Sequence, residues 1–185
     1  MPVNNLSEHM KKIAAIISLS LTLISTANAE NILTNFKDKI YSEWDQSMKG
    51  STELYVPLHT WHNSNYYDNG KKYNENPIGL GIGKSYLDKD KDSHGFYMMA
   101  FSDSHYDIEP MAGYFFTKNF YYNDSYIGVG YTALITARSD MNYIPIPGIL
   151  PIISVGYDKI KLSGTYVPGG HNHGNVGFFW GTYSF

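Results

Sequence analysis

The sequence predicts an all-β fold, an eight-stranded antiparallel transmembrane β-barrel preceded by a short N-terminal amphipathic α-helix. Three observations lead to this fold class. Segments of strand length with alternating side chains recur between clusters of Gly, Asn, Asp and Lys. An apolar run near the N-terminus has the form of a secretory signal peptide. The chain ends on an amphipathic segment whose last residue, Phe185, is aromatic.

The composition agrees with a sheet protein and excludes several other classes. The 185 residues include 17 Tyr, 9 Phe and 17 Gly, a mixture that suits twisted sheets better than helix bundles. The formal net charge is −3, which argues against a nucleic-acid partner held by a basic surface. The chain has no Cys, so disulfides, thiolate metal sites and Cys nucleophiles are excluded.

Residues 1–29 are predicted to be a signal peptide. Lys11 and Lys12 precede the apolar run 13–24, and Ala27-Asn28-Ala29 supplies a cleavage site. The run is shorter than the ~20 apolar residues of a spanning helix, so we expect cleavage rather than an N-terminal membrane anchor. Translation starts at Met1 or at Met10.

Residues 30–50 are predicted to form an interfacial segment, with a helix over 31–46. Its apolar side chains recur at helical spacing and its charged side chains occupy the other side. Such a helix is expected to lie at the membrane interface. A helix that plugs one end of the barrel is the alternative.

Residues 51–185 are predicted to form the barrel. The strands expected are 53–63, 77–87, 95–103, 108–118, 126–137, 150–157, 159–167 and 175–185. The smallest transmembrane barrels have eight strands, each of ~9–11 residues. A soluble sandwich or a lipocalin-like barrel is the alternative, and the signal peptide and the aromatic strand ends favour the membrane form.

The segment 126–137 has few strongly polar side chains on either face. One face of a barrel strand contacts lipid and the other faces the interior. An eight-stranded barrel has room inside for side chains or for one small ligand. The interior is therefore predicted to bind an acyl chain.

Four prolines stand where ladder hydrogen bonds are expected. Pro57 lies inside the first strand and Pro77 opens the second, while Pro151 and Pro168 flank the sixth and seventh. Proline has no N–H to donate to a neighbouring strand. The two pairs predict two local gaps in the wall, through which lipid gains lateral access. Placement at strand ends near the turns is the alternative.

Five stretches of the chain, taken together, resemble a known family. They are Leu54-Tyr55-Val56-Pro57-Leu58-His59-Thr60-Trp61-His62, Tyr73-Asn74-Glu75-Asn76-Pro77, Ala100-Phe101-Ser102-Asp103-Ser104, residues 136–145 and residues 169–175. In this order they resemble the lipid A palmitoyltransferase (PagP) family of Gram-negative outer membranes. The resemblance implies an eight-stranded barrel behind an amphipathic helix, and transfer of an acyl chain from a phospholipid to the lipid A part of lipopolysaccharide.

The resemblance assigns the catalytic roles to His62, Asp103 and Ser104. An imidazole base, a hydroxyl and an orienting carboxylate suit acyl transfer. Because Asp103 and Ser104 are adjacent, they face opposite ways on a regular strand. They are therefore expected at a strand end, and a conventional triad with Ser104 as covalent nucleophile is a hypothesis.

The resemblance also assigns substrate-binding roles. Lys71 aligns with a position linked to lipid A recognition, where a cation meets phosphates; a solvated loop lysine is the alternative. His171 replaces a Tyr that gates phospholipid in enterobacterial members. Phe115 stands where those members have Gly at the floor of the acyl pocket. This predicts a donor chain shorter than palmitate or a pocket floor that has moved, unless Phe115 points outward or Gly128 and Gly130 leave compensating room.

The predicted protein is an outer-membrane phospholipid:lipid A acyltransferase. A non-enzymatic small barrel, such as an adhesin or structural protein, is one alternative, and a lipid A deacylase is another. We expect no cofactor, and no metal, because His171 and His173 lack placed carboxylates. The expected partners are a phospholipid donor and lipopolysaccharide in the outer membrane. The protein is expected to be a monomer or at most a weak homodimer.

Overall fold

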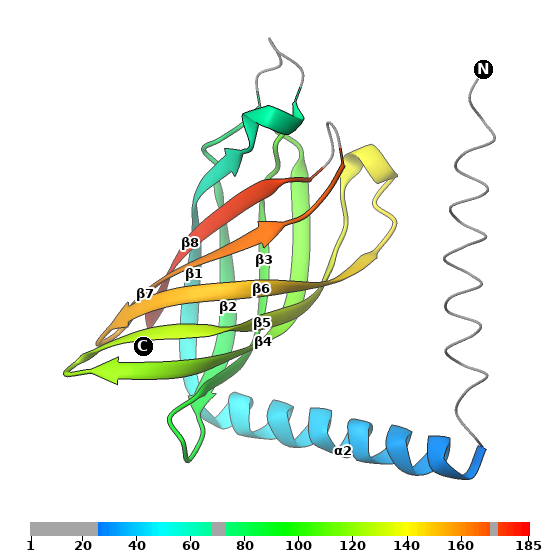
Figure 1. The fold of residues 1–185 in the computed structure, drawn as a ribbon, viewed down its shortest axis with the longest axis vertical. Coiled ribbons are helices and arrows are strands. Elements are labelled where there is room, and N and C mark those ends of the chain that lie inside the picture. Colours follow the sequence, from blue (N-terminus) through cyan, green and yellow to red (C-terminus); the bar gives the residue numbers. More distant parts are fainter. Residues whose placement is uncertain (1–25, 68–72, 171–173) are drawn as a thin grey trace. The chain divides into compact units, whose positions relative to one another are not determined.

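The computed structural model describes residues 26–67, 73–170 and 174–185. Its strands are β1 Ser51–His62, β2 Gly79–Leu87, β3 Ser93–Ser102, β4 Ile108–Tyr122, β5 Ser125–Thr136, β6 Ile146–Tyr157, β7 Ile160–Val167 and β8 Val176–Ser184. They pair antiparallel in sequence order, and β8 closes the barrel against β1 (Figure 1). The predicted fold class is confirmed.

Strands β4 and β6 are each four residues longer than the sequence predicts. β6 begins at Ile146 rather than at Leu150, because Ile146 pairs with Thr136 of β5 in spite of the intervening Pro147. β4 continues to Tyr122, which pairs with Ser125 across a two-residue turn. Asn123 adopts a left-handed φ of 53° in that turn, a conformation that Asn tolerates.

The chain divides into two compact units, Met1–Ser42 and Glu43–Phe185. Helix α2, Thr26–Lys49, belongs in part to each. In the first unit the apolar side chains Ile32, Leu33 and Phe36 are exposed, and interfacial binding stays a prediction. Most of the predicted signal peptide, residues 1–25, lies outside the described residues. None of the described helices is both long and apolar enough to span a bilayer.

In the second unit the last turns of α2 contact strands β2 and β3. The Glu43 carboxylate lies 3.0 Å from Nδ1 of His94 and accepts a 2.7 Å hydrogen bond from the Tyr86 hydroxyl. The Trp44 ring meets Phe96 edge-on, with the ring centroids 5.1 Å apart. These contacts fix residues 43–49 at one end of the barrel.

The alternation of side chains separates an apolar outside from a mixed inside. On β5, Ile127 and Val129 are about half exposed on the outer face, whereas Gly128 and Thr132 are buried inside. Near the α2 end the interior is filled largely by buried polar side chains, among them Glu53, Thr117, Asn119, Ser154, Lys161 and Thr182. The opposite end, where β1 and β3 finish, holds a cavity.

The hydrogen-bond ladder stops early at two places in the wall. Pairing of β1 with β2 ends at Tyr55↔Gly81, just before Pro57, so that 56–62 pairs with β8 alone. Pairing of β6 with β7 ends at Ile152↔Thr165, just after Pro151, so that 146–151 pairs with β5 alone. Both interruptions lie toward the cavity end.

The other two prolines lie outside the strands, at the edges of these interruptions. Pro77 precedes β2 and Pro168 follows β7. The Thr165 hydroxyl donates a 2.6 Å hydrogen bond to the Pro151 carbonyl, which satisfies an acceptor that the interrupted ladder leaves open. Two prolines are thus inside strands and two are at strand ends.

Candidate functional site: a hydrophobic cavity with a histidine–serine pair at its rim

The cavity inside the barrel has a volume of about 510 Å³. Its wall is largely apolar, with Met99, Phe101, Met111, Leu134, Leu150 and Phe178 among the lining side chains. At the loop end its rim carries polar groups from β1, the β3–β4 turn, β4 and the β5–β6 connection. This volume is typical of a pocket for a small molecule, and the wall suits a hydrocarbon chain.

His62 and Ser104 meet at the rim of this cavity. His62 is the last residue of β1, Ser104 lies in the turn after β3, and His62 Nε2 is 2.8 Å from the Ser104 hydroxyl oxygen. The structure therefore brings together two of the three predicted catalytic residues. Both side chains line the cavity, within reach of a group bound there.

Two tyrosines enclose the His62 ring. Tyr73 stacks on it at 4.8 Å between centroids, and Tyr67 meets it edge-on at 5.3 Å. Burial raises the pKa of the Tyr67 hydroxyl above its ordinary value. The hydroxyl thus stays protonated and donates a hydrogen bond to the Gly174 carbonyl. Aromatic packing on two sides limits the rotation of the imidazole and holds Nε2 toward Ser104.

Asp103 organises the turn that carries Ser104. Its Oδ1 accepts hydrogen bonds from the backbone N–H groups of His105 and Asp107, at 2.7 and 3.0 Å. Asp103 follows the end of β3, as its adjacency to Ser104 predicts. The carboxylate near Nδ1 of His62 is that of Glu75, at 4.0 Å. Asp103 is therefore placed to hold Ser104 rather than to orient the imidazole.

Asn74 fastens this turn to the segment that follows β1. Its side-chain amide donates to the Ser102 hydroxyl and to the Asp103 carbonyl, both at 3.0 Å, and its backbone N–H donates to the Ser104 carbonyl at 3.0 Å. Asn74 is buried, and its Oδ1 accepts from the N–H of Asn76. Sequence reasoning did not assign a role to Asn74, although such Asx turns are a recognisable signal before proline.

Replacing Asn74 by Ala should destabilise the barrel by about 1–3 kcal/mol, because the buried Asp103 carbonyl loses its donor. Transfer activity should fall about tenfold, because Ser104 is no longer held beside His62. Urea unfolding and an acyl-transfer assay measure the two effects. Asn76→Ala is the control, since the Asn76 side chain is exposed. Unchanged activity of a destabilised Asn74→Ala protein would contradict the positioning role.

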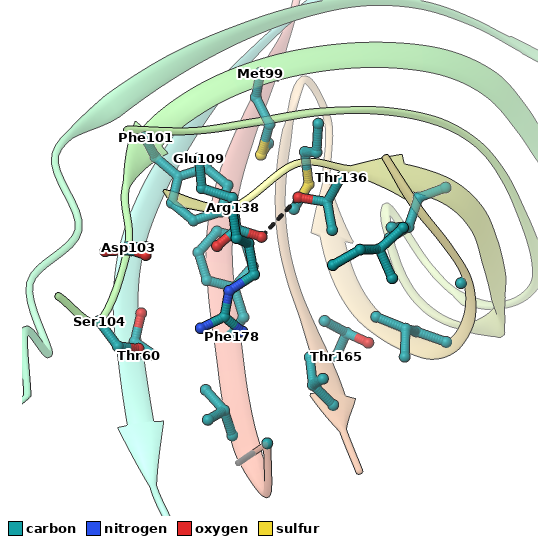
Figure 2. Close-up of a pocket in the computed structure, with 18 of the residues that line it drawn as sticks. Thr60, Met99, Phe101, Asp103, Ser104, Glu109, Thr136, Arg138, Thr165 and Phe178 are labelled. Atoms are coloured by element: carbon teal, nitrogen blue, oxygen red, sulfur yellow. Dashed lines mark hydrogen bonds between the residues drawn. The ribbon is translucent and has the colours of Figure 1, made fainter. Parts of the chain in front are cut away.

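Glu109 and Arg138 also line the cavity, and sequence reasoning missed both. Glu109 accepts a 2.7 Å hydrogen bond from the Thr136 hydroxyl, and Arg138 donates from Nη2 to Asp140 at 3.0 Å. Figure 2 shows the two side chains projecting into the space between the Asp103–Ser104 corner and Thr136. Glu109 could have been identified from the alternation of side chains along β4, which places it on the same face as Met111 and Phe115.

Three residues that line this cavity each carry a buried polar atom with no hydrogen-bond partner within the described part of the chain. The atoms are Nδ1 of His62, Oδ2 of Asp103 and Nε of Arg138. Buried polar atoms are normally paired, so this rim of the cavity is unusually poor in internal hydrogen bonds.

Phe115 points into the barrel and is 5% exposed, which settles the register that the sequence left open. It does not line the large cavity. The deep end of that cavity is formed by Tyr97, Thr132 and Trp180, and Phe115 lines a second cavity of about 20 Å³, which Tyr97 and Trp180 also line. Phe115 thus lies one layer beyond the surface that a ligand meets first.

Two predicted substrate-binding residues, Lys71 and His171, lie outside the described residues, as does His173. Their roles in lipid A recognition, gating and metal binding stay predictions. Among the residues that the structure does describe, no group of three or more His, Asp or Glu side chains is arranged to hold a metal ion.

The interrupted ladder between β6 and β7 borders the cavity directly. Gly148 and Leu150 of β6 and Thr165 and Val167 of β7 all line it. The opening between β1 and β2 is crossed by one backbone hydrogen bond, from the Thr60 N–H to the Glu75 carbonyl at 2.9 Å. The β6–β7 interruption thus has cavity-lining residues on both of its edges.

Comparison with known proteins gives matches over most of the chain. The family described as "Antimicrobial peptide resistance and lipid A acylation protein PagP" matches residues 39–182. The "Lipid A acyltransferase PagP" of Pectobacterium carotovorum is 40% identical over 183 residues, 96% of this chain and 85% of that protein. The protein of the same name from Laribacter hongkongensis is 50% identical over 131 residues, 69% of this chain and 64% of its own length.

A more distant likeness is to a solved structure, the outer membrane protein Ail of Yersinia pestis. It covers 74% of this chain and 99% of Ail, with 9% identity and a TM-score of 0.37. A likeness this remote has no bearing on the chemistry of the site.

Proposed function

We propose, since the chain belongs to the PagP family of lipid A acylation proteins, that it transfers an acyl chain to lipid A in the outer membrane of a Gram-negative bacterium. The observation that carries the proposal is the His62–Ser104 pair, 2.8 Å apart at the rim of a cavity with an apolar wall. The cavity would hold the donor's hydrocarbon chain, which brings the ester carbonyl to the pair.

The donor in this proposal is a glycerophospholipid. His62 Nε2 acts as general base and accepts the proton of the hydroxyl that attacks the donor ester. In a two-step reaction that hydroxyl belongs to Ser104, and an acyl-serine is then attacked by a hydroxyl of lipid A. In a one-step reaction the lipid A hydroxyl attacks directly, and Ser104 positions it. In both, the donor ester releases lysophospholipid, which takes the proton from His62. In the second step of the two-step reaction His62 takes the proton of the lipid A hydroxyl and returns it to the departing Ser104 oxygen.

Lateral access to the site is proposed at the two ladder interruptions. The β6–β7 opening, beside Pro151 and Pro168, leads straight to cavity-lining residues on both strands. This opening is the proposed route of the donor chain. The β1–β2 opening, beside Pro57 and Pro77, lies next to His62, where the acceptor is needed. Outside these openings the outward faces of the strands are rich in exposed aliphatic and aromatic side chains, as in a lipid-facing barrel wall.

Mass spectrometry of lipid A from cells with and without the gene tests the function. The expected result is lipid A with one additional acyl chain when the gene is expressed, and no addition with a Ser104→Ala variant. Loss of a chain from lipid A would instead show a deacylase, in which water takes the acyl group. Unchanged lipid A, with the folded barrel present in the outer membrane, would show a non-enzymatic barrel.

A further inference from the structure

A buried ion pair occupies the barrel interior beyond the cavity, and the proposed reaction does not use it. Lys161 Nζ lies 3.2 Å from Oε1 of Glu53, and both side chains are buried. Glu53 also accepts hydrogen bonds from the hydroxyls of Tyr55 and Ser184. Burying two charges requires both to lose hydration, so such a pair is weak support for stability. Its place in the barrel points to another role.

The ion pair lies beneath the layer that closes the large cavity. That layer includes Tyr97, whose hydroxyl is 2.9 Å from the Thr132 hydroxyl, and Trp180. Under it the Lys161 ammonium stands 4.7 Å from the centre of the Phe115 ring. The small cavity of about 20 Å³ is lined by Phe115, Lys161, Tyr97 and Trp180 together, which is space for about one water molecule.

We propose that the Lys161–Glu53 pair sets the depth to which a donor acyl chain can enter the barrel, with the Phe115 ring covering the ammonium. This inference rests on the proposed function and assigns its chain-length specificity to named residues. A methyl terminus that passed the Tyr97–Trp180 layer would meet first the Phe115 ring and then the charged pair. Hydrocarbon packed against the pair would solvate neither charge, so burial of a chain there is unfavourable. The pair thus acts as a polar floor, and the favoured donors are those whose chains end above it.

If both the ring and the ion pair block the chain, their substitutions should have non-additive effects on the preferred chain length. Phe115→Gly alone uncovers the ammonium and lets water into the vacated space, so the preferred chain length should stay within one pair of methylenes of the wild type. Lys161→Met with Glu53→Gln, changed together so that no single charge is stranded, should also leave the preference in place, since Phe115 still blocks the path. Combining all three substitutions should favour longer chains by a factor of about ten or more over either partial variant.

The assay uses full-length protein refolded in detergent, phosphatidylcholines graded from decanoyl to stearoyl, and lipid A as acceptor. Each rate is divided by the rate of the same variant with its best donor, which cancels general damage to the enzyme. Phe116→Gly is the matched control, because it removes a neighbouring ring from the same strand on the outer face. Heat-dependent electrophoretic mobility identifies the folded barrels that are compared.

A second readout does not depend on catalysis. Native mass spectrometry measures which lysophosphatidylcholines of graded length each folded variant retains, and the triple variant should shift toward longer chains. A shift in Phe115→Gly alone as large as in the triple variant would overturn the role of the ion pair. The same preference in all variants, in both readouts, would overturn the floor itself. Folded wild-type protein that retains lipids but transfers none would count against the proposed function, and the retained lengths would still decide the inference.

Discussion

Replacing His62 by Ala should lower acyl transfer to lipid A by a factor of about 10²–10⁴, the usual contribution of a positioned general base. The reason is geometric: Nε2 of His62 is 2.8 Å from the Ser104 hydroxyl, whereas His105, which also lines the cavity, has its imidazole 3.8 Å from the Asp103 carboxylate. Transfer from a labelled phospholipid to lipid A in detergent measures the loss. Ser104→Ala should show a loss of the same order if Ser104 is the nucleophile.

His59→Ala is the matched control for this experiment. His59 is on the same strand, but it is exposed on the outer face, where its ring stacks on Phe179. It should therefore keep transfer near the wild-type rate. Full activity of a folded His62→Ala protein would remove His62 from the reaction.

Two Asp103 variants distinguish between two roles of its carboxylate, as the acceptor that holds the turn and as a negative charge at the site. Asp103→Ala removes the acceptor of two backbone N–H groups and should abolish most transfer by releasing the turn. Asp103→Asn keeps an oxygen for those N–H groups and should retain much more activity. If Asn is as inactive as Ala, the negative charge itself is needed at the site.

A disulfide across the β6–β7 opening should reduce transfer at least a hundredfold, and a reductant should restore it. Because the chain has no Cys, two introduced thiols have no competitor. Leu150→Cys with Val167→Cys extends the Ile152↔Thr165 register by one inward-facing pair and joins the two edges of the opening. A bond there draws the strand edges to disulfide distance and closes the proposed route of the donor chain. Mass spectrometry of the oxidised protein establishes that the bond has formed.

The control cross-link joins the same two strands where they are already paired. Val155 and Leu162 are register partners in the β6–β7 ladder, both exposed on the outer face, so a disulfide between them leaves the opening unchanged. This variant should keep its activity under oxidising conditions. Full transfer by the verified Leu150–Val167 cross-linked protein would show that the donor reaches the cavity by another route.

The sequence was a sufficient guide to the barrel because of local periodicity. Strand segments such as 126–137 alternate two distinct faces, and turn residues such as Asn123-Asp124 separate them. No helical segments separate these strands, so nothing covers the edges of an open sheet. Closing the sheet into a barrel pairs the N–H and C=O groups of the two edge strands. The eight strands were therefore predictable, with errors of a few residues at the start of β6 and the end of β4.

The candidate site was only partly predictable. Adjacency placed Asp103 and Ser104 at a strand end, and the resemblance supplied His62 as their companion. The amide of Asn74 and the inward side chains of Glu109 and Arg138 escaped notice, because a polar residue in one sequence carries no sign of what lies across the barrel from it. The Lys161–Glu53 pair, 108 residues apart, escaped notice for the same reason.

The sequence by itself determined the number of strands, their order and the two faces of each, since these follow from short-range alternation and turn chemistry. Only the tertiary structure decided which face is the inside, because a shift of one residue in register exchanges all inward and outward side chains. That choice turned Phe115 inward and left it beneath the Tyr97–Trp180 layer. Barrel closure likewise decided that His62 meets Ser104 while Asp103 binds its own turn, since such contacts depend on the stagger between strands that no local pattern encodes.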